Sequence, residues 1–337
     1  AHKAYAKSER LSVLHKLMGK IEESLDSDEL RPGNLRDLSI ALGTTLDKYR
    51  LEEKEDPTGK DVGEIRQLFD KMKEEGITVQ SCITSPPYYG LRNYGIDGQI
   101  GLEQTPEEYI ENMVDVFRKV REVLNDDGTL WINIGDSYYN YRPGNLSYPK
   151  QTIASNNQDL PTNSAKRNNK LQGYKEKDLI GIPWMLAFAL RNDGWYLRQD
   201  IIWSKPNPMP ESVKDRCTKS HEYIFLLSKN QNYYFDTLYE PSVCDGKERR
   251  KRSVWEVQLK PYKGAHFATY PEELIIPCIL ASSRVGDTIL DPFLGSGTTA
   301  RVSERLNRNW VGCELNESYL ELQEERLERT GLHSFFE

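Results

Sequence analysis

From about residue 77 onward, the sequence alternates short apolar runs with longer segments in which apolar residues recur at helical spacing. The runs predict strands at 78–84, 129–134, 196–203, 222–228, 233–236, 287–291 and 309–314, and the longer segments predict helices at 106–124, 183–193, 272–282, 298–306 and 317–329. Strands that alternate with helices in this way form a largely parallel sheet with helices on both faces. The pattern therefore predicts an α/β fold. Because such sheets bind ligands at the carboxyl ends of their strands, functional residues should directly follow strands.

The first 75 residues have a different pattern. Apolar residues recur at helical spacing in three segments, residues 11–25, 35–49 and 62–76. We therefore expect a helical N-terminal region, residues 1–75, followed by an α/β domain, residues 76–337. The simpler interpretation of the N-terminal region is a helical hairpin that packs on the main domain. The alternative is a helix-turn-helix with Gly43 in its turn, which would make the region a DNA-contacting extension.

Composition excludes several classes of protein. The 337 residues, of which 37% are hydrophobic, suffice for a large packed core. No apolar run reaches the roughly 18 residues of a membrane span, and the N-terminus lacks the apolar stretch of a secretory signal, so the sequence predicts a cytoplasmic protein without a membrane partner. The five cysteines are scattered without a Cys-x-x-Cys pair. This argues against a disulfide framework and against a zinc site, and no metal is expected.

The net charge of −7 means that any affinity for nucleic acid must come from local basic patches. Two segments are candidates. Residues 137–180 contain seven Lys or Arg against three Asp or Glu, and residues 247–252 read KERRKR. Taken alone, the charge of each segment is typical of a solvated loop. Whether these segments bind nucleic acid therefore depends on the motifs around them.

A glycine-rich turn follows the strand predicted at 287–291. The sequence DTILDPFLGSGTTA runs from an apolar strand into Gly295 and Gly297, whose backbone can adopt angles denied to other residues. The next predicted strand ends in Glu314, a carboxylate that can accept hydrogen bonds from both hydroxyls of a ribose. The turn is not GxGxxG and no GKS or GKT follows, so it favours a nucleoside without phosphates. Because the chain ends soon after this turn, the remaining strands must come from earlier sequence, which predicts a permuted strand order.

A second motif, Ser85-Pro86-Pro87-Tyr88, follows the strand predicted at 78–84. Two consecutive prolines lack N–H groups and hold the backbone extended. Their carbonyls can then act as acceptors beside the Ser85 hydroxyl, and the Tyr88 ring is available for stacking. Acceptors next to an aromatic face suit a planar group with an exocyclic amino group, such as cytosine or adenine.

Together, SPPY and FLGSG resemble the amino-methyltransferases of DNA, which methylate the exocyclic nitrogen of cytosine or adenine. In that family a (D/N/S)PP(Y/F) tetrapeptide holds the target base and an FxGxG turn holds S-adenosylmethionine. The order here, SPPY first, is similar to the permuted subgroup often called the beta class. The resemblance covers residues 78–330 and includes YGLRNYG, DGTLWINIGDSY, DGWYLRQDIIWSKPNPMPES, HEYIFLLSK and HFATYPEEL. It implies a Rossmann-like S-adenosylmethionine-dependent methyltransferase sheet of seven strands in circularly permuted order, and it does not clearly cover residues 1–75.

The resemblance also implies roles for individual residues. It implies that the target amino group is held by Ser85, Pro86, Pro87 and Tyr88. It implies that the cofactor, S-adenosylmethionine, is bound by Asp291, Phe293, Gly295, Ser296, Gly297, Glu314, His266 and Thr269. In this family context, the basic segments 137–180 and 237–263 become expected DNA-contacting insertions. The residues expected to contact double-stranded DNA are Lys205, Lys247, Arg249, Arg250, Arg252, Lys166 and Arg167.

The expected reaction is direct methyl transfer to a base that is flipped out of the duplex and stacked on Tyr88. In the family that this chain resembles, serine before Pro-Pro is commoner in cytosine-N4 enzymes, whereas Asp or Asn is commoner in adenine-N6 enzymes. We therefore expect site-specific methylation of cytosine N4, with adenine N6 as the alternative. Further alternatives are a non-catalytic sequence-specific DNA-binding protein and methylation of RNA or of a protein amide. For a protein with this function, the expected protein partner is a cognate restriction endonuclease.

Two other residues invite a catalytic interpretation. Cys278 follows Pro277, and ring-carbon methylation uses a cysteine after proline, but this pair lies in an apolar helical stretch and is interpreted as part of the core. His221 precedes the strand predicted at 222–228. Because direct transfer to an amine leaves a separate base little to do, His221 is interpreted as a structural residue or one that contacts the DNA backbone.

Overall fold

The computed structural model describes residues 60–91, 99–139, 171–242, 246–260 and 270–314, together with residues 316, 319, 323, 326 and 327. The helices predicted at 11–25 and 35–49 lie outside the described residues, as does most of the helix predicted at 317–329. Four predicted site residues also lie outside them, namely Lys166, Arg167, His266 and Thr269.

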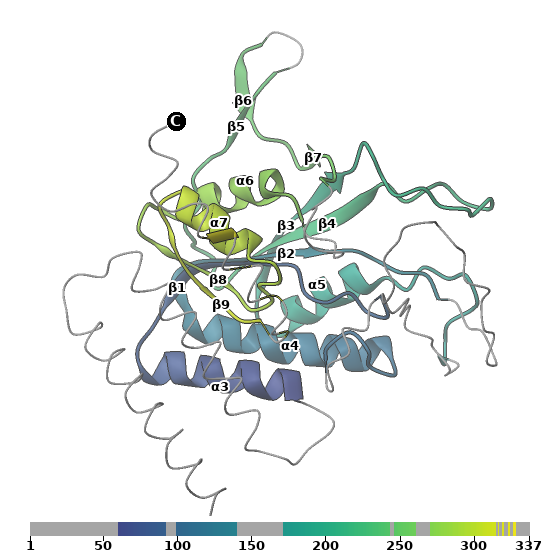
Figure 1. Cartoon of the computed structure of the whole chain (residues 1–337), viewed down its shortest axis with the longest axis horizontal. Helices are drawn as coiled ribbons and strands as arrows, with labels where there is room; N and C mark the ends of the chain where they lie inside the picture. The colour runs from purple at the N-terminus through teal and green to yellow at the C-terminus, as the bar shows by residue number, and fades with distance from the viewer. Residues whose placement is uncertain are drawn as a thin grey trace, which may run out of the picture.

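A seven-stranded sheet forms the centre of the protein (Figure 1). Its strands lie in the order β7-β3-β4-β2-β1-β8-β9. In chain order they are β1 (Val79–Thr84), β2 (Leu124–Ile134), β3 (Tyr196–Ser204), β4 (His221–Ser228), β7 (Val254–Glu256), β8 (Thr288–Asp291) and β9 (Asn309–Gly312). β4 runs antiparallel to both β2 and β3, and the other described pairings in the sheet are parallel. The predicted fold is confirmed, including the permuted order: among the described strands, the late strand β8 lies beside the early strand β1, and β9 lies beside β8 at the edge.

Helices cover both faces of the sheet (Figure 1). The helices α4 (Pro106–Val123) and α5 (Ile182–Asn192) lie on one face, and α6 (Glu272–Ser282) and α7 (Thr298–Arg305) lie on the other. The start of α4 is set by a capping box, in which the Thr105 side chain accepts from the Glu108 backbone and the Glu108 side chain accepts from the Thr105 backbone. Among the described residues, no helix is both long and apolar enough to cross a membrane.

The helix α3 (Lys60–Glu74) corresponds to the third helix predicted for the N-terminal region. It packs against α4, with Ile65, Phe69 and Met72 buried in the same apolar cluster as the α4 side chains. This helix is therefore an outer layer over α4 (Figure 1).

The sequence prediction was wrong for one strand. Residues 233–236 form no strand, because the Tyr234 amide donates to the carbonyl of Asp127 and the Asp236 amide donates to the carbonyl of Ala281 at the end of α6. The aromatic residues that produced the strand signal pack as a loop, with Phe235 stacked on Trp131 at 6.5 Å between ring centroids. The seventh strand is β7 instead. A separate hairpin of β5 (Tyr239–Pro241) and β6 (Glu248–Arg250) precedes it and was not predicted.

Candidate active site

The two predicted motifs meet at one edge of the sheet. SPPY follows β1 and the glycine turn follows β8, and these strands are parallel neighbours in which Ser81 pairs with Ile289. At their carboxyl ends, the hydroxyl of Thr84 donates to Oδ1 of Asp291 at 2.6 Å. Thr84 and Asp291 are the last residues of their strands, so the two loops leave the sheet side by side.

The SPPY loop is held by a helix beneath it. The hydroxyl of Tyr109, a fully buried residue of α4, donates to the carbonyl oxygen of Pro87 at 2.8 Å. Pro86 is buried, and Ser85 is half-buried. The Pro87 carbonyl is thus bound inside the protein, and the acceptors expected to face a base are the Ser85 hydroxyl and the Pro86 carbonyl.

The substitution Tyr109→Phe tests this support. It removes the hydroxyl and leaves the Pro87 carbonyl without that donor, so we expect the free energy of unfolding to fall by about 1–3 kcal/mol. The exposed strand residue Tyr196 provides a matched control, and Tyr196→Phe should change stability by no more than about 0.5 kcal/mol. Urea denaturation of both variants checks this, and equal stability of Tyr109→Phe and the wild type would contradict it.

Asp291 is the centre of a buried hydrogen-bond cluster. Besides Thr84, its carboxylate accepts from the backbone N–H of Phe293 at 3.0 Å, from the hydroxyl of Thr299 at 2.5 Å and from that of Tyr270 at 3.2 Å. Burial raises the pKa of the Asp291 carboxyl from 3.8 to about 6, against the lowering effect of these hydrogen bonds. The carboxylate thereby fixes the start of the glycine turn against β1 and α7. Its predicted contact with a cofactor remains a prediction.

This raised pKa predicts how stability depends on pH. Between the unfolded pKa near 4 and the folded pKa near 6, the folded state retains a proton that the unfolded state has lost, so stability falls as pH rises through this window. We expect the wild type to lose up to about 3 kcal/mol between pH 4 and pH 7 through this group, and Asp291→Asn to lack that component. Urea denaturation across this pH range measures the difference, and parallel pH profiles for the two proteins would contradict the assignment.

The glycine turn between β8 and α7 adopts the backbone that its sequence predicts. Gly295 and Gly297 have φ angles of +55° and +79°, in the left-handed region that favours glycine. The Glu314 carboxylate, just beyond β9, accepts from the backbone N–H of Gly295 at 2.7 Å and from that of Asn316 at 2.8 Å. Among the described residues, a Cβ atom added at Gly295 would meet only the Phe293 carbonyl, at 3.9 Å, so this part of the protein leaves one side of the Gly295 backbone open to a ligand.

The back of the turn is held by two residues that the sequence reasoning missed. Arg326 donates from Nη1 to the carbonyl and the hydroxyl of Ser296, at 3.1 and 2.5 Å, and Gln323 donates to the carbonyl of Gly295 at 2.6 Å. The Ser296 side chain is therefore turned toward Arg326 and is buried, and the contact of Ser296 with the cofactor remains a prediction. Gln323 and Arg326 are spaced i, i+3 within the helix predicted at 317–329, a spacing that places two side chains on one face.

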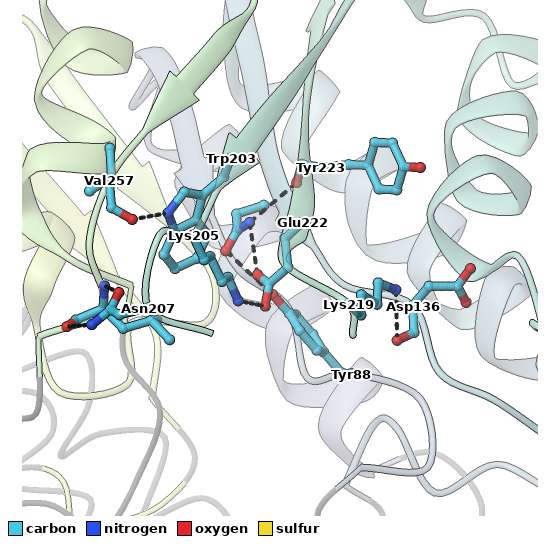
Figure 2. A network of polar contacts seen from close by, with 11 residues as sticks. Tyr88, Asp136, Trp203, Lys205, Asn207, Lys219, Glu222, Tyr223 and Val257 are labelled. Atoms are coloured by element: carbon cyan, nitrogen blue, oxygen red, sulfur yellow. Dashed lines mark hydrogen bonds and ion pairs between the residues drawn. The ribbon is translucent and has the colours of Figure 1, made fainter. Parts of the chain in front are cut away.

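A third group of side chains lies at the same edge, where β3 ends and the antiparallel β4 begins (Figure 2). The hydroxyl of Tyr88 donates to Oε2 of Glu222 at 2.6 Å, and the ammonium group of Lys205 forms an ion pair with the other carboxylate oxygen. Lys205 was predicted to contact DNA. Only 13% of its side chain is exposed, and its ammonium group is paired with Glu222. Its contact with DNA remains a prediction.

Comparison with known proteins identifies the family. The sequence model of the DNA methylase family, which covers N6 and N4 methyltransferases, matches residues 79–325. This chain belongs to the DNA methylase family. Among curated relatives, the type II methyltransferase M.Cfr9I of Citrobacter freundii is 51% identical over 252 residues, which cover 74% of this chain and 82% of that protein. M.SmaI of Serratia marcescens is 49% identical over 273 residues, which cover 80% of this chain and 90% of that protein.

Solved structures agree on the fold of this DNA methylase. The PvuII DNA methyltransferase, described as cytosine-N4-specific, has a TM-score of 0.54 at 18% identity and covers 77% of this chain and 83% of its own. A putative DNA modification methylase of Thermus thermophilus, solved as a complex with S-adenosyl-L-methionine, has a TM-score of 0.53 at 22% identity and covers 80% and 93%. At these identities the likeness bears on the fold alone, and it agrees with the predicted methyltransferase sheet.

Basic residues of the predicted DNA-contacting segment 237–263 lie on and next to the β5–β6 hairpin of the methylase, which stands off the sheet beyond α6 (Figure 1). Arg249 is paired with Glu240 across the hairpin, with 3.1 Å between the charged groups. Lys247, Arg250 and Arg252 are exposed.

Cys278 is a core residue in this methylase. Its side chain is buried in the apolar cluster of α6, its thiol donates to the Leu274 carbonyl, and burial raises the pKa of the thiol. A buried thiol with a raised pKa is a poor nucleophile. The structure thus confirms the interpretation of Pro277–Cys278 as packing.

Proposed function

We propose that this DNA methylase transfers a methyl group from S-adenosylmethionine to the exocyclic N4 of cytosine in duplex DNA. The observation that carries the proposal is the hydrogen bond between Thr84 and Asp291, because it places the SPPY loop and the glycine turn next to each other. The family membership supports both the reaction type and the methyl donor.

The residues around the glycine turn fit this cofactor. The open side of Gly295 allows close approach to the backbone, and the carboxylate of Glu314 is the kind of acceptor that ribose hydroxyls need. Phe293, which is partly buried at the start of the turn, offers an aromatic face to a cation. When bound, S-adenosylmethionine supplies a methyl group activated by a sulfonium. The protein's part is to hold that group in line with the amine.

The SPPY residues would prepare the amine. Its nitrogen is a weak nucleophile because the lone pair is delocalised into the ring. In the proposed mechanism, the Ser85 hydroxyl and the Pro86 carbonyl accept the two amino hydrogens and favour a tetrahedral nitrogen with a localised pair. Transfer is then direct, without a covalent enzyme adduct: the bond between nitrogen and the methyl carbon would form as the bond between that carbon and sulfur breaks, the sulfur would leave as a neutral thioether, and the methylated amine would lose one proton to solvent. Alignment of the reacting groups can lower the barrier by about 7–11 kcal/mol.

Cytosine is proposed as the target because the residue before Pro-Pro is a serine, Ser85. This choice rests on the tendency of cytosine-N4 enzymes of the family to have serine at this position. Inside a duplex the amino group is hidden in the base stack, so the proposal includes extrusion of the base.

Exposed Lys247, Arg250 and Arg252 are proposed to bind phosphates, and Arg249, which is paired with Glu240, remains in this set as a weaker candidate. A cognate restriction endonuclease is proposed as a partner because the relatives are named type II methyltransferases.

One experiment tests the activity and the target base together. The protein is incubated with unmethylated plasmid DNA and methyl-labelled S-adenosylmethionine. The DNA is digested to nucleosides, which are separated by chromatography against N4-methylcytosine, 5-methylcytosine and N6-methyladenine nucleoside standards and identified by mass. We expect N4-methylcytosine. N6-methyladenine alone would transfer the target to adenine, and the absence of label in DNA despite sequence-specific DNA binding would favour a non-catalytic protein. Parallel reactions with RNA and with protein test the remaining alternatives.

A further inference from the structure

Glu222 lies at the centre of a polar network that joins the ends of four strands (Figure 2). Its Oε2 atom accepts from the hydroxyl of Tyr88, which follows β1, and from Nδ2 of Asn133 in β2 at 3.2 Å. Its Oε1 atom accepts from Lys205, which follows β3. Only 16% of the Glu222 side chain is exposed, so this is a largely desolvated carboxylate with donors on both oxygens.

Lys205 supplies the charge that such a carboxylate needs. Its ammonium group lies 4.2 Å from the ring centroid of Trp203, and the Trp203 indole is itself held by a 2.8 Å hydrogen bond to the carbonyl of Val257 (Figure 2). Replacing a buried ion pair by apolar residues is often neutral or stabilising. Stability alone therefore does not explain why Lys205 and Glu222 form an ion pair here. A better explanation is that the pair positions another group.

The group that it positions is Tyr88. A Cβ atom added at Gly135 would lie 2.7 Å from Cε2 of Tyr88, so the ring packs directly against the Gly135 backbone. Glu222 holds the hydroxyl at the other end of the same side chain. Burial, and then the charge of Glu222, raise the pKa of Tyr88, so the phenol stays protonated and remains a donor. Tyr88 is the last residue of SPPY, and a fixed ring there fixes the end of that loop.

We propose that Glu222 is a positioning residue for methyl transfer: with Lys205 as its counter-ion, it holds Tyr88 and thereby the SPPY loop in the geometry that receives the base. This role rests on the proposed function. It also gives Lys205 a role as the counter-ion of Glu222, and it links the loop after β3 to the loop after β1.

A double-mutant cycle tests the role. We expect Glu222→Gln and Tyr88→Phe each to lower kcat by about 10- to 100-fold, with the KM for DNA and the Kd for S-adenosylmethionine changed by no more than about 2-fold. Because Glu222 acts through the Tyr88 hydroxyl, the double variant should be no slower than the slower single variant. The control is Glu122→Gln, which removes a carboxylate of the same type from ion pairs with Lys73 and Lys119 and should leave kcat unchanged.

In Gly135→Ala, the added methyl group would collide with the ring of Tyr88 and displace it. This variant should therefore also lower kcat, although it removes no polar group. An unchanged kcat in Glu222→Gln, or effects of Glu222→Gln and Tyr88→Phe that multiply in the double variant, would overturn the role. If Glu222→Gln does not fold, Tyr88→Phe and Gly135→Ala decide instead, and wild-type kcat in both contradicts the proposal. A wild-type protein that methylates no duplex contradicts the proposed function itself, whereas an active wild type with unaffected variants contradicts only the role of Glu222.

Discussion

Ser85→Ala is expected to lower kcat by about 100-fold or more while the Kd for S-adenosylmethionine stays within about 2-fold of the wild type. The substitution removes the hydroxyl that is proposed to accept an amino hydrogen, an interaction that matters most when the nitrogen becomes tetrahedral. It leaves intact the hydrogen bond from Tyr109 to Pro87 that holds the loop. Steady-state methylation of a duplex substrate gives kcat, and calorimetric titration gives the Kd.

Ser283 provides a matched control for this experiment. It is a buried serine at the C-terminal end of α6, its hydroxyl donates to the Ile279 carbonyl at 2.7 Å, and Ser283→Ala should retain the wild-type kcat. Unchanged turnover in Ser85→Ala would remove the hydroxyl from the chemistry. A large rise in the cofactor Kd with little change in kcat would instead place Ser85 on the cofactor side of the site.

Glu314→Ala should raise the Kd for S-adenosylmethionine by about 10- to 100-fold, which corresponds to about 1.4–2.7 kcal/mol. The variant removes the acceptor for the Gly295 and Asn316 amides, so the turn loses its shape at the same time as the proposed ribose contact is lost. Because Glu314 is proposed to bind the cofactor and not the target base, kcat at saturating cofactor should change less than the Kd. Calorimetric titration measures the Kd directly.

Glu314→Gln separates the two effects. An amide oxygen can still accept from one backbone N–H but can no longer accept at both positions, so an intermediate Kd is expected. If Glu314→Ala binds the cofactor as tightly as the wild type does, the ribose assignment is wrong. The surface variant Glu122→Gln again serves as the charge-matched control.

Much of the fold could be predicted from local sequence because strand and helix periodicities depend on near neighbours. Six of the predicted strands and the helices at 106–124, 183–193, 272–282 and 298–306 were found within a few residues of their predicted ends. The segment 233–236 shows the limit of this reasoning. Its aromatic residues resemble a strand, but its backbone bonds go to Asp127 and Ala281, more than 40 residues away on either side.

The candidate site shows the same division. SPPY, the glycine turn and Glu314 were recognisable because each is a short motif that directly follows a strand. Glu222 and Arg326 were not identified as site residues, because nothing within their own segments indicates which groups they bind. Lys205 was predicted to contact DNA, but its sequence segment does not indicate that its ammonium group forms an ion pair with Glu222.

The sequence by itself determined the α/β class, the identity of the two motif loops and the backbone freedom of the turn at Gly295 and Gly297, because these follow from periodicity and from the residue type at single positions. Only the tertiary structure decided that Thr84 meets Asp291 across a separation of 207 residues and that Glu222 takes both Tyr88 and Lys205 as partners. Hydrogen bonds and ion pairs between distant residues depend on strand order and register, and these are set by the packing of the whole sheet between its two layers of helices.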